Sequence, residues 1–317
     1  MTTETNTELS PFKKLFYRPP FIGLMAFLVV FLVQGLGHTQ MILMESIFHT
    51  GVYTSAFITG LIGAVALWIA MRSDNEVTAT WVGFFAGTFL WTGWIEFAYV
   101  WSAHVLLGVE PVMKANSPDE IATKGEYIVM MSSVGVMLAI LMPLMMNRET
   151  KCNMFQWFQR HLGLRTGKPS SGYKRNFGYI TALETIYILW FCYLMLLFLY
   201  DDKGVYGLND HHPVAVGFFV FLCAWSLYLI NRLRQMWKVT TAIRYAIPTA
   251  IISYSAYEIL GRWNIGQDIW VEPGKYALEL SLFFGALIAV WVISALIPAH
   301  VKTLFDKDRR QQQPKAG

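Results

Sequence analysis

The chain has 317 residues, of which 55% are hydrophobic, 15% aromatic and only 15% charged, and its mean hydropathy is +0.41. Soluble globular proteins carry about 25% charged residues, so this chain has too few charges to cover a surface in water. The composition excludes a soluble enzyme, a disordered chain and a nucleic-acid-binding protein. Its three cysteines have no CxxC spacing, which excludes a disulfide framework and a structural zinc site.

The apolar stretches predict an all-α polytopic membrane protein with eight transmembrane helices, because about 20 apolar residues are needed to span a bilayer as a helix. A cytoplasmic tail over 1–20 comes first and a basic cytoplasmic loop over 147–177 divides the chain. A second cytoplasmic tail follows over 299–317. The predicted spans are 21–44, 54–72, 79–104 and 127–146 before the loop, and 178–200, 213–231, 241–261 and 276–298 after it.

The charges are distributed unequally over the two sides of this topology. The tails and every second connection hold 20 basic and 8 acidic residues, a net charge of +12, whereas the opposite side holds 5 basic and 13 acidic residues, a net charge of −8. Basic residues concentrate on the cytoplasmic side of membrane proteins. We therefore expect a bacterial inner-membrane protein with both termini in the cytoplasm. Acidic residues contribute little to orientation, so the acidity of the outer side requires a separate cause.

An internal duplication relates the two halves, 21–146 and 178–298. Shifting the chain by 162 residues aligns 72–111 with 234–273 and produces eight identities in forty positions. Glu96 aligns with Glu258, and Val109-Glu110-Pro111 aligns with Val271-Glu272-Pro273. Four spans in each half is an even number, so we predict a parallel 4+4 repeat about an axis along the membrane normal. Recurrence of tryptophan and glutamate at membrane interfaces is the alternative explanation.

Two carboxylates inside predicted spans are the first candidates for function. Glu96 and Glu258 lie about six to eight residues before the outer ends of the third and seventh spans. A carboxylate at that depth is costly and usually faces the bundle interior, where it serves a functional site. The duplication would bring the two together, and a shared pair of carboxylates can bind a cation or retain a proton. The alternative for Glu258 is local pairing with Arg262, four residues further along the helix.

Histidines near the same depth predict a metal site. His38 lies near the end of the first span and His104 ends the third, so that His38, Glu96, His104 and Glu258 are the candidate ligands. Imidazole and carboxylate groups suit copper, iron or zinc, and bundles build metal sites from facing helices. No compact ExxH motif is present, and the alternative is that each histidine is an interfacial hydrogen-bonding residue.

Further polar residues surround this predicted site or its access route. A first span that continued as a helix would place His38, Glu45 and His49 on one face. His211 and His212 follow an aspartate in the fifth-to-sixth connection, where they either capture a cation or simply precede the helix-initiating Pro213. The expected access or supporting residues are Glu45, His49, His211, His212 and Arg262.

Three functions remain open at this stage. The first is an inner-membrane redox protein, or the membrane subunit of an oxidoreductase complex, with a metal in the outer leaflet. The second is a cation- or proton-coupled transporter or channel that uses Glu96 and Glu258. The third is a non-catalytic scaffold for periplasmic partners. The expected partners are the lipid bilayer, which the basic loop around Trp157 would contact, and other membrane or periplasmic subunits, but no nucleic acid.

Overall fold

The computed structural model describes residues 18–114, 117–147, 150, 152–164, 172, 174–199, 211–263, 265, 269–270 and 272–295. The predicted all-α fold class is confirmed, and the one sheet in these ranges is an antiparallel hairpin of β1 (Val112–Lys114) and β2 (Ser117–Thr123). The helical elements are α2 (Phe21–Phe48), η1 (His49–Gly51), α3 (Val52–Arg72), α4 (Glu76–Leu90), η2 (Trp91–Glu96), α5 (Phe97–Trp101), η3 (Ser102–Leu107), α6 (Gly125–Ser132), α7 (Val134–Met146), α8 (Asn153–His161), α9 (Phe177–Leu199), α10 (Pro213–Leu233), α11 (Val239–Arg262) and α12 (Ala277–Ala295).

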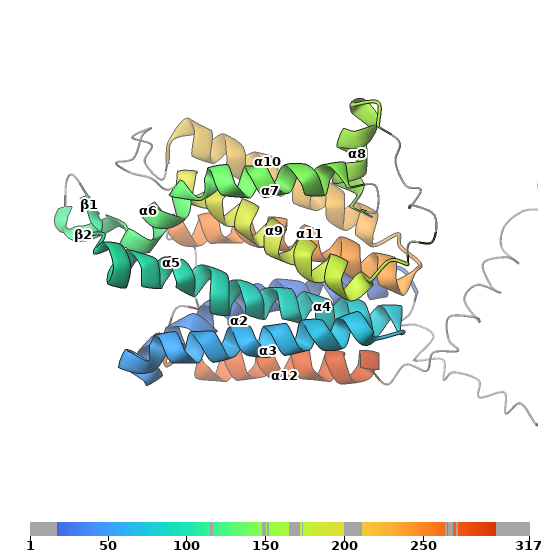
Figure 1. The fold of residues 1–317 in the computed structure, drawn as a ribbon, viewed down its shortest axis with the longest axis horizontal. Coiled ribbons are helices and arrows are strands. Elements are labelled where there is room, and N and C mark those ends of the chain that lie inside the picture. The colour runs from blue at the N-terminus through green and yellow to red at the C-terminus, as the bar shows by residue number, and fades with distance from the viewer. Residues whose placement is uncertain are drawn as a thin grey trace, which may run out of the picture.

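The long helices run along one common direction, and the chain reverses between successive ones (Figure 1). One end of the bundle, which we call the basic end, holds the α3–α4, α7–α9 and α10–α11 connections. The opposite end, which we call the acidic end, holds η1, the β1–β2 hairpin and the α11–α12 connection. Connections of opposite predicted charge thus lie at opposite ends.

Apolar helices of membrane-crossing length are present. Three helical stretches in the described ranges are long and apolar enough to cross a membrane, namely Phe21–Arg72, Phe177–Leu199 and Pro213–Leu233. The first of them folds back on itself at η1 to form the α2–α3 hairpin (Figure 1). The pair α6 and α7 also passes as one span with a bend of 44°. These findings support a membrane protein, whereas the count of eight spans stays a prediction.

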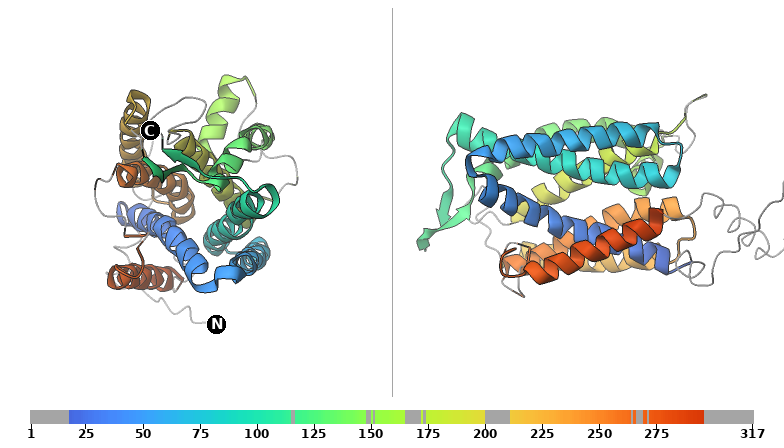
Figure 2. Two further views of the ribbon diagram at one scale, coloured as in Figure 1. Left: turned by 90° about the vertical axis from the view of Figure 1, so that its left-hand side faces the viewer. Right: turned by 90° about the horizontal axis from the view of Figure 1, so that it is seen from below.

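The long helices form two layers (Figure 2). The layer that we call the α9 layer contains α3, the continuous helix from α4 to η3, α7 and α9, and α9 packs against α3, α4 and α7. The layer that we call the α2 layer contains α2, α10, α11 and α12, and α2 packs against the other three. Contacts of α11 with α4 and α9 join the layers. The first long helix of each half of the chain therefore packs among helices of the other half.

Glycines permit the close approach of α4 and α9. A Cβ atom built at Gly83 would lie 2.4 Å from the carbonyl oxygen of Gly178, and one at Gly87 would lie 2.7 Å from that of Ala182. Small residues at helix crossings allow backbone contact, which replaces the hydrophobic driving force that is missing between helices in lipid. The close crossing of α4 and α9 is therefore possible only because Gly83 and Gly87 have no side chain.

Replacing Gly87 by Ala should destabilise the protein by about 1–3 kcal/mol, because the added methyl group meets backbone that cannot give way locally. Gly217→Ala is the matched control, since a Cβ atom at Gly217 meets nothing within 4 Å. Thermal unfolding of both variants in detergent measures the difference. Equal midpoints for the two variants would show that the α4–α9 crossing is not close.

Candidate functional site

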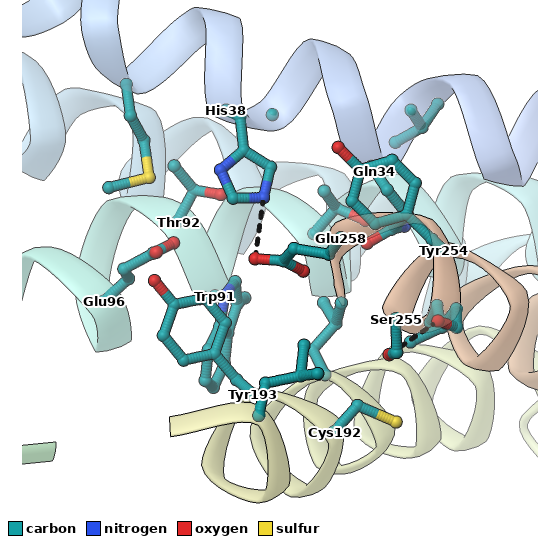
Figure 3. A pocket seen from close by; sticks show the side chains of 17 residues that line it. Gln34, His38, Trp91, Thr92, Glu96, Cys192, Tyr193, Tyr254, Ser255 and Glu258 are labelled. Carbon is teal, nitrogen blue, oxygen red and sulfur yellow. Dashed lines mark hydrogen bonds and ion pairs between the residues drawn. The ribbon is translucent and has the colours of Figure 1, made fainter. Parts of the chain in front are cut away.

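A cavity of about 60 Å³ lies between the two layers, with walls from α2, from α4 and η2, from α9 and from α11 (Figure 3). Aliphatic and aromatic side chains form much of the wall, and polar groups from all four helices converge on the space. The polar and ionisable lining residues are Gln34, His38, Thr88, Thr92, Glu96, Cys192, Tyr193, Tyr254, Ser255 and Glu258.

His38 and Glu258 face each other across this cavity. The His38 Nε2 atom lies 4.0 Å from the Glu258 Oε1 atom, and the two side chains are 32% and 30% exposed (Figure 3). The His38 ring also stacks on the Tyr254 ring at a centroid distance of 6.0 Å and an interplanar angle of 21°. The stacking fixes the plane of the imidazole, so that the ring nitrogen points at the carboxylate of α11.

Glu96 reaches the cavity from a π-helical segment. Residues Trp91–Glu96 form η2, in which the wider turn carries an extra residue relative to an α-helix. Trp91 and Glu96, five residues apart, therefore both line the cavity. The opposite face of η2 packs at Gly93, where a Cβ atom would lie 2.3 Å from the backbone nitrogen of Gly60 in α3. Insertions of this kind are frequent at functional sites.

The Glu96 carboxyl is almost completely buried, with 6% of the residue exposed. The Tyr193 hydroxyl and the Trp91 indole lie within hydrogen-bonding reach of this carboxyl. Tyr193 in turn lies within hydrogen-bonding reach of Tyr127 of α6. Burial of a carboxylate is costly unless polar groups replace the lost water. The two aromatic donors supply that replacement for Glu96.

The two carboxylates belong to one site. Glu96 interacts electrostatically with both His38 and Glu258, and all three side chains point into the same cavity (Figure 3). The structure thus brings together three of the four residues that the sequence proposed as metal ligands.

The fourth of these residues, His104, lies elsewhere. It belongs to η3 near the acidic end, and its Nε2 atom is 3.2 Å from the Glu126 Oε2 atom. No group of three or more His, Cys, Asp or Glu side chains in the described part of the chain is arranged to hold a metal ion. The copper, iron or zinc site therefore remains a sequence prediction.

The helical continuation beyond His38 is confirmed through Glu45 but stops one residue before His49. Helix α2 ends at Phe48, and His49 has φ 42° and ψ −104°, a positive-φ backbone conformation at which the chain turns into η1. Glu45 and His49 are both exposed and neither lines the cavity. The helix ends here because the chain must reverse into α3.

The remaining access candidates lie at the acidic end. The His212 Nδ1 atom accepts a hydrogen bond of 3.2 Å from the Val214 backbone N–H, which caps α10 ahead of Pro213. His211 stacks on Trp263 at 5.5 Å, and Arg262 is the last residue of α11, one turn beyond Glu258. None of the three lines the cavity. The neighbouring aspartates at 201, 202 and 210 lie outside the described residues.

Several cavity residues were not found from the sequence. Tyr193, Tyr254 and Ser255 looked like ordinary residues of apolar spans, because aromatic and small hydroxyl residues are common in membrane helices. The available signal was helical periodicity, since Ser255 and Tyr254 lie one turn before Glu258 on α11. No such signal existed for Tyr193, whose partner Glu96 is on a helix remote in sequence.

Comparison with known proteins supplies no relative: no protein-family model, curated protein or solved structure matches this chain.

The contact between His38 and Glu258 should appear as energetic coupling. We expect the destabilisation caused by His38→Gln and Glu258→Gln to be non-additive by at least about 0.5 kcal/mol, because each substitution alone leaves a polar group without its partner. Unfolding in mixed detergent micelles measures the free energies of the single and double variants. Pairing His38→Gln with Glu126→Gln, whose side chain contacts His104 instead, is the control and should be additive. Additivity of both pairs would contradict the observed contact.

Proposed function

We propose that this protein moves protons or small monovalent cations across the membrane, with Glu96 and Glu258 as the carboxylates that bind them. The observation that carries the proposal is the convergence of two carboxylates and one imidazole, from helices of both layers, on a single cavity among apolar helices. Ionisable residues inside transmembrane segments mark ion and proton pathways because their burial is otherwise unfavourable.

The volume of the cavity limits what can bind there. One water molecule needs a cavity of about 10–15 Å³. The cavity of about 60 Å³ therefore holds only a few water molecules. Pockets for drug-sized molecules measure about 300–1,000 Å³. The site therefore suits a proton, or a small cation with some of its water, and is too small for a metabolite in this conformation.

The packing of the layers supports the proposed 4+4 repeat with eight spans. Glu96 of the first half faces Tyr193 on α9, the first helix of the second half. Glu258 of the second half faces His38 on α2, the first helix of the first half. A two-fold axis along the membrane normal would exchange these two pairs. Such an axis would pass close to the cavity, where parallel repeats meet in transporters.

The redox function has less support from the contacts than transport has. Three of its four proposed ligands line the cavity, but the fourth, His104, instead pairs with Glu126. A scaffold for periplasmic partners would have no use for buried carboxylates facing a shared cavity. The redox function and the scaffold function stay predictions from the sequence. A measurement of ion flux distinguishes both of them from transport.

Flux in proteoliposomes tests the proposal. Purified protein should carry a cation current under an imposed membrane potential, measured in parallel with a pH-sensitive dye for protons and with a sodium-sensitive dye for Na⁺. Glu96→Gln and Glu258→Gln should each lower that flux at least roughly tenfold, the factor that corresponds to about 1.4 kcal/mol of lost binding or barrier energy. Glu279→Gln, at the exposed start of α12, is the matched control and should leave the flux unchanged. Absence of flux for both ions, or equal flux in all three variants, would overturn the proposal.

A further inference from the structure

A second group of partly buried charges lies near the basic end of the bundle. The Arg244 Nη1 atom of α11 is 3.1 Å from the Glu76 Oε1 atom of α4, and these side chains are only 14% and 17% exposed. Arg244 also interacts electrostatically with Glu184 of α9, whose Oε1 atom accepts a hydrogen bond of 3.4 Å from the Thr150 hydroxyl. Arg244 thus forms an ion pair with Glu76 of α4 and lies within the electrostatic reach of Glu184 of α9.

The helices of this second group are also walls of the cavity. Glu76 and Glu96 are the first and last residues of the continuous segment of α4 and η2, while Arg244 and Glu258 lie on α11 two heptads apart. Residues separated by 14 positions lie close to one face of a helix. Each of these two helices therefore carries one ionisable residue toward the basic end and one at the cavity.

An apolar layer separates the two groups. Phe84, Ile247 and Ile251 are at most 3% exposed and pack in one buried cluster, and Ile251 also lines the cavity. The hydroxyl oxygens of Thr181 and Thr185, on α9 near Glu184, are buried and have no hydrogen-bond partner. Buried polar groups normally find protein or water partners. These two hydroxyls on α9 are therefore exceptions to that rule.

We propose that Arg244 closes the basic end of the pathway through its ion pair with Glu76, an inference that rests on the transport function proposed above. The guanidinium occupies a place beside this carboxylate that a cation leaving the pathway would need, and Glu184 lies within its electrostatic reach. Release of a cation and retention of this ion pair exclude each other, so opening requires Arg244 to leave Glu76.

Access to the cavity from the basic end tests the role of Arg244 without any measurement of flux. The reporter is Gln34→Cys, which lines the cavity, in a protein whose Cys152, Cys192 and Cys223 are replaced by Ala. A membrane-impermeant thiol reagent is applied to vesicles in which only the basic end faces the reagent. Labelling should be slow with Arg244 present and roughly tenfold faster in Arg244→Gln, whereas Arg244→Lys should restore slow labelling.

Lys174→Gln is the matched control. Lys174 pairs with Asp74 at 3.7 Å at the same end, but both side chains are more than 90% exposed, so labelling should not change. Should Arg244→Gln fail to fold, Glu76→Gln removes the other side of the same ion pair and should accelerate labelling as well. Unchanged labelling in folded Arg244→Gln or Glu76→Gln, or fast labelling from the basic end with Arg244 intact, would overturn the proposal. Altered labelling in a protein that carries no ion would instead contradict the transport function and leave the closing role of Arg244 intact.

Discussion

Carboxylates buried among apolar helices persist only where other polar groups replace the water that they have lost, and this requirement determines how the bundle is assembled. Glu96 depends on Tyr193 and Trp91, and Glu258 on His38. Tyr193 and His38 each belong to a helix of the other half of the chain. The polar partnerships therefore require α9 and α2 to pack across the halves, which is the arrangement that the two layers have.

The close helix crossings make these partnerships possible. Backbone contact at Gly83 and Gly87 brings α9 against α4, and the π-helical turn of η2 directs Glu96 toward the space that results. The helices α4 and α11 also carry charges at the basic end, where Arg244 forms an ion pair with Glu76 and interacts electrostatically with Glu184 of α9. Polar groups thus meet at two depths with an apolar layer between them, an arrangement that suits controlled passage of a small ion.

The sequence predicted the helices well because their length and hydropathy are local properties. The fifth and sixth predicted spans, 178–200 and 213–231, agree with α9 (Phe177–Leu199) and α10 (Pro213–Leu233) to within two residues. The third predicted span, 79–104, corresponds to a continuous helix from Glu76 to Leu107, which two π-helical turns extend. A π-helical turn leaves no pattern in hydropathy, since it depends on packing against a neighbouring helix.

The site was only partly predictable for a related reason. Glu96 and Glu258 stand out because a charge in an apolar stretch is visible in the sequence, and His38 lies at a similar depth. The turn at His49 and the pairing of His104 with Glu126 depend on how connections pack, so the sequence could not separate these histidines from His38. Tyr193 was missed because its role is defined by a partner 97 residues away in the chain.

Infrared difference spectroscopy of the carboxyl groups shows whether Glu96 and Glu258 share one ion. Spectra recorded on acidification and on addition of Na⁺ should contain carboxyl bands that disappear separately in Glu96→Gln and Glu258→Gln. Because interacting sites titrate as a pair, removal of one carboxyl should displace the band and the apparent titration midpoint of the other. Two bands that titrate independently, each unchanged by removal of the other residue, would contradict a shared site.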